Sequence, residues 1–250
     1  MPWTRPESSQ FRAKGRLTAP TDALPAAIDG ARLFGRIDTW VNNAAVSAYG
    51  RLEQISDGDA RRIFDVNFWG TVKGSLVALP FLRRQGGALI NVGSEASEAS
   101  APLQGIYTAS KHAVKGYTDT LRIELLEAKE EDISITLIQP TAVDTPFPQH
   151  ARNYMAEEPK LPSPQLDPED VAEAILKAAE HPQRDVKAGG TAVLKTTMAK
   201  VAPSLADKLG TKVVDQQKAD EPPRDPDGTL YKAGESGQTR GSAARAQGAA

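Results

Sequence analysis

The chain has 250 residues, which is enough for one large α/β domain with a full hydrophobic core and terminal tails. Its 30 lysine and arginine residues nearly balance its 32 aspartate and glutamate residues, and no run of five or six like charges occurs, so we expect no nucleic-acid partner. Because cysteine is absent and the three histidines are scattered, we expect no disulfide and no metal site.

The sequence predicts no segment that enters a membrane. Residues 1–15 lack the apolar stretch of a secretion signal, and nowhere do eighteen apolar residues follow one another. We therefore expect no membrane partner and a cytoplasmic location.

The first elements are read from hydrophobic spacing. Residues 1–21 follow neither a helical nor a strand period, so we expect an irregular leader. A short helix is expected between Asp22 and Gly35, and a short strand over Ile37–Val41. Asp57 is predicted to cap a long helix that continues to Leu82.

The same order of elements then repeats. Strands are predicted over Ala88–Val92 and Ile133–Ile138, where short runs of apolar and β-branched residues occur, and a long helix over Ile106–Ala128. Strands that alternate with helices favour right-handed crossovers and a parallel sheet, hence an α/β fold.

The second half of the chain contains a long proline-rich connection. It runs from Pro140 to Pro164, and connections of that length usually carry function. A helix is expected over Pro168–Glu180, capped by Asp167, followed by a strand within Val186–Leu194.

The expected domain ends near residue 195. A helical extension is predicted over residues 196–218, which packs on the domain or, alternatively, on a partner. Residues 219–250 contain few large apolar side chains and are expected to be disordered.

Tyr107 and Lys111 form the first candidate catalytic pair. Four residues separate them in a predicted helix, so both lie on one face. A phenol with a pKa of about 10 is a poor acid–base catalyst at neutral pH, but a nearby cation lowers that pKa. Such a pair also occurs on ordinary solvated helix surfaces.

Two further polar residues gain meaning from their order in the chain. Ser94 follows the predicted strand Ala88–Val92, at the sheet end where open parallel sheets bind ligands, although a serine there is more often a turn or cap residue. Asn67 lies inside a predicted helix, where asparagine is unfavourable and usually structural.

The order and spacing of these motifs resemble the short-chain dehydrogenase/reductase family. The string from Asn42 to Ala45 is similar to the family's Asn-Asn-Ala-Gly motif, and Asn67, Ser94, the Tyr107-Thr-Ala-Ser-Lys111 string and Pro140–Pro146 follow in the family's order. The resemblance implies a Rossmann-like, doubly wound parallel sheet and an NAD(P)-dependent oxidoreductase that interconverts an alcohol and a carbonyl compound.

The resemblance also implies residue roles. Tyr107 would exchange a proton with the substrate oxygen, Ser94 would bind that oxygen, and Lys111 would lower the pKa of Tyr107 and bind the nicotinamide ribose. Asn67 would hold a water of a proton relay. The remaining residues implied to contact NAD or NADP are Asn43, Ala44, Ala45, Pro140, Thr141, Val143 and Thr145. Ala45 and Thr141 stand where the family usually has glycine.

The largest departure from the family is at the front of the chain. No Thr-Gly-x-x-x-Gly-x-Gly turn, which binds the cofactor pyrophosphate, occurs in the sequence. We therefore expect that about the first three strands are lacking and that residues 1–21 are unrelated to the family. The second strand normally carries the residue that distinguishes NAD from NADP, so the choice of cofactor cannot be predicted.

Two functions are compatible with this sequence. The chain is an oxidoreductase acting on a small alcohol or carbonyl substrate, or it is an inactive fragment that retains only an oligomerisation surface. In either case we expect a homodimer or homotetramer. The predicted contact includes Ile63, Val66, Trp69, Leu76, Tyr117, Leu121 and Leu125 on the two long helices.

Overall fold

The structure, a computed structural model, describes residues 29–31, 33–232, 234 and 238–241. The expected leader lies outside the described residues, as does most of the helix expected between Asp22 and Gly35. Of that helix, residues 29–31 and 33–34 are described and are helical.

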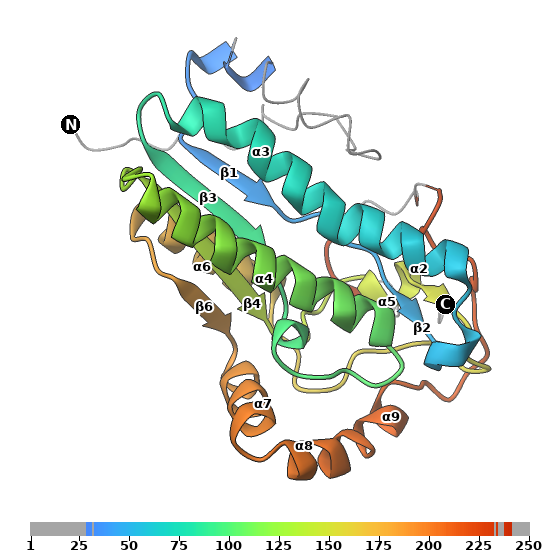
Figure 1. The fold of residues 1–250 in the computed structure, drawn as a ribbon. Coiled ribbons are helices and arrows are strands. Elements are labelled where there is room, and N and C mark those ends of the chain that lie inside the picture. Colours follow the sequence, from blue (N-terminus) through green and yellow to red (C-terminus); the bar gives the residue numbers. More distant parts are fainter. Residues whose placement is uncertain (1–28, 32, 233, 235–237, 242–250) are drawn as a thin grey trace.

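The core of the fold is a parallel sheet of four strands in the order β1-β3-β4-β6 (Figure 1). The register places Val41 beside Ile90, Ile90 beside Thr136, and Ile138 beside Val186. The strands are β1 (Thr39–Asn42), β3 (Gly87–Val92), β4 (Ile133–Pro140) and β6 (Asp185–Ala188). In the described part of the chain no strand precedes β1, which forms one edge of this sheet.

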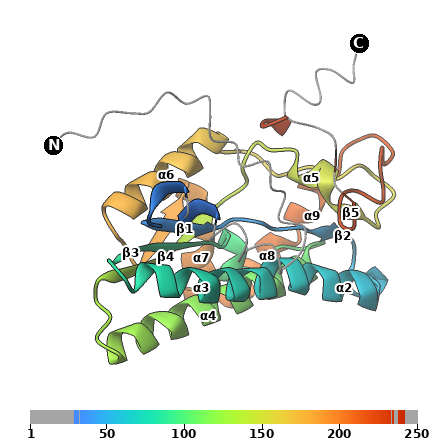
Figure 2. The same cartoon turned by 90° about the horizontal axis from the view of Figure 1, so that it is seen from above.

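Helices cover both faces of the sheet, as expected for a Rossmann-like fold. Figure 2 shows α3 (Gly70–Leu82) and α4 (Gly105–Glu127) on one side and α6 (Pro168–Glu180) on the other. Apolar side chains fill both interfaces, because each helix turns one apolar stripe toward the strands. The α3–α4 side buries Leu79, Leu82, Leu89, Leu121, Leu125 and Ile133, and the α6 side buries Ile90, Ile138 and Ala178.

The predicted helix from residue 57 to Leu82 is divided into three parts. These are α2 (Asp57–Phe64), a π-helical turn over Asp65–Trp69, and α3. The prediction that Asp57 caps this helix is wrong. The cap is Ser56, whose hydroxyl accepts a hydrogen bond of 3.1 Å from the backbone N–H of Asp59. Serine and aspartate are equally good caps, so spacing alone did not distinguish neighbouring positions.

The long connection after β4 is ordered. It contains α5 (Phe147–His150) and β5 (Arg152–Asn153), and β5 pairs in parallel with β2 (Ala48–Tyr49).

Two short 3-10 turns lie earlier in the chain, at Leu52–Gln54 and Glu95–Ser97.

The strand predicted within Val186–Leu194 is too long. Strand β6 ends at Ala188, Gly189 has a φ of +98°, and the helix α7 begins at Gly190. Glycine tolerates this conformation and so reverses the chain direction. The helices α7 (Gly190–Val201), α8 (Pro203–Gly210) and α9 (Val213–Gln216) follow, and Pro203 starts α8. They extend past the carboxyl ends of β4 and β6 (Figure 1).

The prediction of disorder from residue 219 onward is wrong for residues 219–232. Leu230 is 1% exposed and packs beside Ala48 and Ile63. Its backbone carbonyl accepts a 3.1 Å hydrogen bond from Arg62, and the Tyr231 hydroxyl donates a 2.8 Å bond to Asp59. One leucine and a few polar contacts fix a segment whose overall composition is typical of disorder. Residues 242–250 lie outside the described residues.

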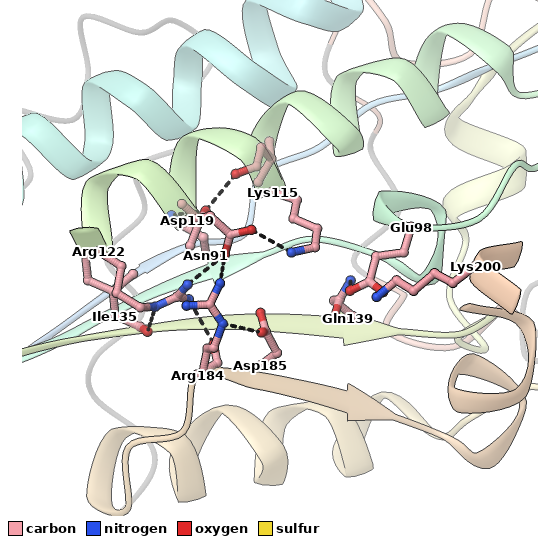
Figure 3. Close-up of polar contacts among 12 residues, drawn as sticks. Asn91, Glu98, Lys115, Asp119, Arg122, Ile135, Gln139, Arg184, Asp185 and Lys200 are labelled. Atoms are coloured by element: carbon pink, nitrogen blue, oxygen red, sulfur yellow. Dashed lines mark hydrogen bonds and ion pairs between the residues drawn. The ribbon is translucent and has the colours of Figure 1, made fainter. Parts of the chain in front are cut away.

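Ion pairs and hydrogen bonds join α4 to β4 and to the residue that precedes β6 (Figure 3). Asp119 accepts hydrogen bonds from Lys115 at 2.6 Å, from Arg122 at 2.7 Å and from Arg184 at 2.8 Å. Arg122 also donates to the carbonyl of Ile135 in β4. These bonds lower the pKa of Asp119 although partial burial opposes them. They join α4, β4 and the start of β6, and so hold the helix that carries Tyr107 and Lys111.

Candidate active site

A cavity of about 1890 Å³ lies at the carboxyl ends of β1, β3 and β4. Open parallel sheets bind their ligands at this end. The cavity is lined by Ser94 and by all the residues for which cofactor contact is predicted: Asn43, Ala44, Ala45, Tyr107, Lys111, Pro140, Thr141, Val143 and Thr145. Of the predicted site residues, only Asn67 is outside the lining.

Ser94 and Tyr107 meet at the wall of this cavity. Ser94 follows β3 and its hydroxyl accepts a 3.1 Å hydrogen bond from the backbone N–H of Ala96, so it caps the short turn at Glu95–Ser97. It also forms a side-chain hydrogen bond with Tyr107, which lies in the first turn of α4. Ser94 is therefore both a cap residue and a neighbour of the candidate catalytic phenol.

The environment of Tyr107 favours the neutral phenol. Burial raises its pKa to about 12, the bond with Ser94 acts in the opposite direction, and the nearby charge of Glu95 raises the pKa further. The ring also packs edge-on against Phe147, with centroids 5.6 Å apart. The tyrosine–lysine pair predicts a lowered pKa for Tyr107, whereas burial in the described structure raises it.

Lys111 is 2% exposed and lies against the face of the Tyr107 ring, with its ammonium nitrogen 5.7 Å from the ring centroid. The ammonium donates a 2.8 Å hydrogen bond to the backbone carbonyl of Val92. Burial lowers the pKa of Lys111 to about 8, because a desolvated ammonium loses its hydration.

Asn67 is fully buried in the π-helical turn. Its amide N–H groups donate to the carbonyl of Val46 and to the hydroxyl of Ser110, both at 2.9 Å, and its oxygen accepts from the N–H of Val46 at 2.8 Å. Ser110 in turn donates to the carbonyl of Tyr107. Asn67 thus links the loop after β1 to the first turn of α4, and its role in holding a relay water stays a prediction.

Thr141 takes part in a network of hydrogen bonds. Its hydroxyl donates a 2.8 Å hydrogen bond to Glu95 and lies 2.9 Å from the hydroxyl of Thr191 in α7. Its side chain is thereby held between the turn after β3 and α7.

Sequence reasoning missed the carboxylates of that turn. Glu95 accepts a 2.7 Å hydrogen bond from Lys195, and Glu98 is bonded by Gln139 at 3.0 Å and by Lys187 and Lys200 (Figure 3). Burial alone would raise the pKa of Glu98, but these bonds and charges lower it to about 2. The one available signal was that Glu95 directly follows Ser94; the two lysines of α7 are about a hundred residues away in sequence.

Two kinds of feature are absent from the described residues. No group of three or more potential metal ligands occurs among them. Within the same residues, no helix combines the length and the apolar character that crossing a bilayer requires.

Comparisons with known proteins agree on one family. The sequence profile of the short chain dehydrogenases matches residues 8–156. The match begins within the expected leader, so the prediction that residues 8–21 are unrelated to the family is wrong. The oxidoreductase YxnA of Bacillus subtilis is 42% identical over 206 residues, or 80% of this chain and 58% of its own length.

Other relatives are covered less completely. The 11-beta-hydroxysteroid dehydrogenase 1A of Arabidopsis thaliana is 34% identical over 53% of this chain, which spans 37% of that protein. This chain thus covers less than two thirds of the length of these relatives.

Solved structures show the same fold. A short chain dehydrogenase of Burkholderia cenocepacia in complex with NADP has a TM-score of 0.65 and 23% identity, covering 78% of this chain and 76% of that one. An alcohol dehydrogenase of Thermococcus sibiricus complexed with 5-hydroxy-NADP has a TM-score of 0.57 and 25% identity, covering 69% and 70%. The fold, the profile match and the convergence of Ser94, Tyr107 and Lys111 on one cavity lead to the same conclusion: the chain belongs to the short chain dehydrogenase family.

Proposed function

We propose that this protein interconverts an alcohol and a carbonyl compound with NAD or NADP, and that Tyr107 is the acid–base group. The observation that carries the proposal is the meeting of Tyr107, Ser94 and Lys111 at the wall of one cavity. Two proteins of this fold were solved in complex with NADP and with 5-hydroxy-NADP, which supports the choice of cofactor class.

The described residues fit the nicotinamide end of the cofactor. Asn43, Ala44 and Ala45 line the cavity after β1, and Pro140, Val143 and Thr145 line it after β4, so small and apolar groups face the space next to Tyr107. For the pyrophosphate the described residues offer no glycine-rich turn before β1. We therefore assign no residue to that end.

The residues of this chain would have the following roles in the reaction. The cofactor, when bound, supplies or accepts hydride. The neutral phenol of Tyr107 donates its proton to the substrate oxygen, which its raised pKa allows at neutral pH. Ser94 binds the same oxygen, and the ammonium of Lys111, 5.7 Å from the centroid of the Tyr107 ring, stabilises the phenolate that is left when the proton has been donated. Asn67 positions the first turn of α4 through Ser110.

A second candidate function is a non-catalytic oligomerisation module. It is favoured by exposed apolar side chains on the outer faces of α3 and α4 and the turn before α3: Trp69, Leu76, Ile123 and Leu126 are 48%, 56%, 65% and 61% exposed. Three residues predicted for this contact do not belong to it. Ile63, Leu121 and Leu125 are buried within the chain itself: Ile63 packs with Ala48 and Leu230, and the two leucines pack between α3, α4 and the sheet.

Titration of the full chain with NADH and NADPH by calorimetry distinguishes the two candidates. Micromolar binding of either cofactor, with oxidation of the reduced nicotinamide when a ketone is added, is the result we expect for an enzyme. A folded, oligomeric protein that binds neither cofactor at millimolar concentration would leave only the oligomerisation module.

A further inference from the structure

The cavity extends well beyond Ser94 and Tyr107. Its volume of about 1890 Å³ exceeds the roughly 300–1000 Å³ of a site for one small ligand. The predicted cofactor contacts lie at the strand ends and in the loops that directly follow them, and the opposite wall is built from Phe147, Leu161 and Pro162 of the connection after β4 and from α6, α7, α8 and α9. Space for a second large ligand is therefore present beside Tyr107.

The side chains of this opposite wall are predominantly apolar. They come from separate segments that only the fold brings together, and α7 and α8 supply one large side chain each. The largest apolar ones are Phe147, Leu161, Ile175, Met198 and Leu209. A ligand that covers such a wall gains free energy in proportion to the apolar surface it buries.

The ionised groups inside the cavity are already satisfied by partners in the chain. Glu95 is paired with Lys195 at 2.7 Å and with the hydroxyl of Thr141, and Glu98 is paired with Lys187 and Lys200. Apart from Lys111 beside Tyr107, whose ammonium donates to the carbonyl of Val92, the inner cavity offers an anionic ligand a cation only if these pairs are broken. A cationic ligand would likewise have to break them to contact Glu95 or Glu98.

The rim does not favour an anion either. Apart from Lys111, which is buried beside Tyr107, the remaining charged residues of the lining are exposed, and three of the four are acidic. They are Arg51, Glu53, Asp207 and Asp215. Acidic side chains at an entrance repel a carboxylate or phosphate ligand.

We propose that the part of the cavity beyond Tyr107 binds a bulky, uncharged and mainly apolar ketone or alcohol, and that α7 and α8 determine this specificity. The inference rests on the proposed function in one respect, since Tyr107 and Ser94 fix the end at which the oxygen of the ligand lies. The pairs Glu95–Lys195 and Glu98–Lys200 hold α7 in place as the wall of this site.

The first test measures binding without cofactor. The full chain is titrated by calorimetry with 2-alkanones of increasing length, from 2-hexanone to 2-decanone, and with 9-oxodecanoate as a charged ketone of matched length. We expect affinity to rise about fourfold with each methylene group. We expect the keto acid to bind at least tenfold more weakly than 2-decanone. Affinity that does not depend on length, or a keto acid that binds better, would overturn the proposal.

Two leucines of α8 provide a matched pair of variants. Leu209 lines the cavity, whereas Leu205, one turn earlier, does not and is 52% exposed. We expect Leu209→Asp to weaken 2-decanone binding tenfold or more and Leu205→Asp to leave it unchanged, with circular dichroism showing that both are folded. If Leu209→Asp is unfolded, Met198→Gln in α7 takes its place with the same expectation. Equal effects at positions 205 and 209 would contradict a binding wall on α8.

Measuring NAD(P)H oxidation together with ketone binding distinguishes a failure of the apolar site from a failure of the proposed reaction. Length-dependent binding of ketones without any NAD(P)H oxidation would contradict the proposed reaction and support the apolar site. Reduction of short ketones with no preference for chain length would support the proposed reaction and contradict the apolar site.

Discussion

The ammonium of Lys111 donates its 2.8 Å hydrogen bond to the carbonyl of Val92, the last residue of β3. The candidate catalytic helix is thus joined to the strand whose end carries Ser94. Lys111 is only 2% exposed, and the burial of a cation costs free energy.

This burial predicts that stability depends on pH. The pKa of Lys111 is about 8 in the folded protein, below its usual 10.5, so the folded state binds fewer protons than the unfolded chain between these values. Unfolding free energy should therefore rise with pH across this window, by up to about 3 kcal/mol. Urea unfolding at pH 7.5 and pH 10 measures the effect, below the range in which the raised pKa of Tyr107 acts in the opposite direction.

Replacing Lys111 by an uncharged residue should remove its contribution to the pH dependence of the unfolding free energy. Lys111→Met should have a smaller rise between pH 7.5 and pH 10 than the wild type, whereas Lys73→Met, on the exposed face of α3, should follow the wild type. An unchanged rise in Lys111→Met would assign the pH dependence to another group.

Tyr107→Phe should lower turnover by about 100- to 10,000-fold with little change in cofactor affinity, because only the proton donor is lost. Tyr231→Phe is the matched control. It removes a hydroxyl that bonds Asp59 on α2, outside the cavity lining, and should leave turnover unchanged. Steady-state kinetics with a ketone substrate measures both, and normal turnover in Tyr107→Phe would show that another group donates the proton.

Glu98→Gln should lower the unfolding free energy at pH 7 by about 2 kcal/mol, since hydrogen bonds from charged partners are lost. The pKa of Glu98 is about 2, below its usual 4.5, so its contribution is complete above pH 4.5 and decreases as pH falls toward 2. The gap between wild type and variant should therefore be smaller at pH 3 than at pH 7. Glu173→Gln, at an exposed pair on α6, should show neither effect.

Gly74 permits the close approach of α3 to β1. A methyl group at this position would overlap the side-chain oxygen of Asn42, whose amide is held by Ser75 at 3.0 Å and by Asn91 at 2.8 Å. Gly74→Ala should therefore destabilise the protein by about 1–3 kcal/mol. Gly116→Ala, in an open position of α4, should instead stabilise it by about 1 kcal/mol. Thermal unfolding of both variants checks the opposite signs.

The sequence allowed accurate prediction where local signals decide the structure. The helix α6 has the predicted bounds, because Asp167 caps it and Pro168 begins it. The strand end at Ala188 was missed because its cause is a turn at Gly189, followed by a helix that packs on the Glu95–Ser97 turn. Runs of valine, leucine and threonine are compatible with strand or helix, and only contacts decide between them.

The candidate site was likewise predictable only in the part that sequence motifs identify. Motif order identified the residues that line the cavity near Tyr107, but it could not identify Glu95 and Lys195 as partners, since 100 positions separate them. The apolar wall was missed for the same reason. Its side chains belong to segments without a shared motif, so only the tertiary structure shows that they face one space.

The packing of residues 219–232 has a consequence for synthesis of the chain. Arg62 of α2 donates to the carbonyl of Leu230, which lies 168 positions later. At roughly 5–20 residues per second, a ribosome needs on the order of 10–30 s to make the intervening stretch. Throughout that interval Ala48 and Ile63 lack the leucine that covers them. Completion of this cluster therefore waits until Leu230 has been translated, and a nascent chain arrested before that point would present the uncovered side of α2 to chaperones.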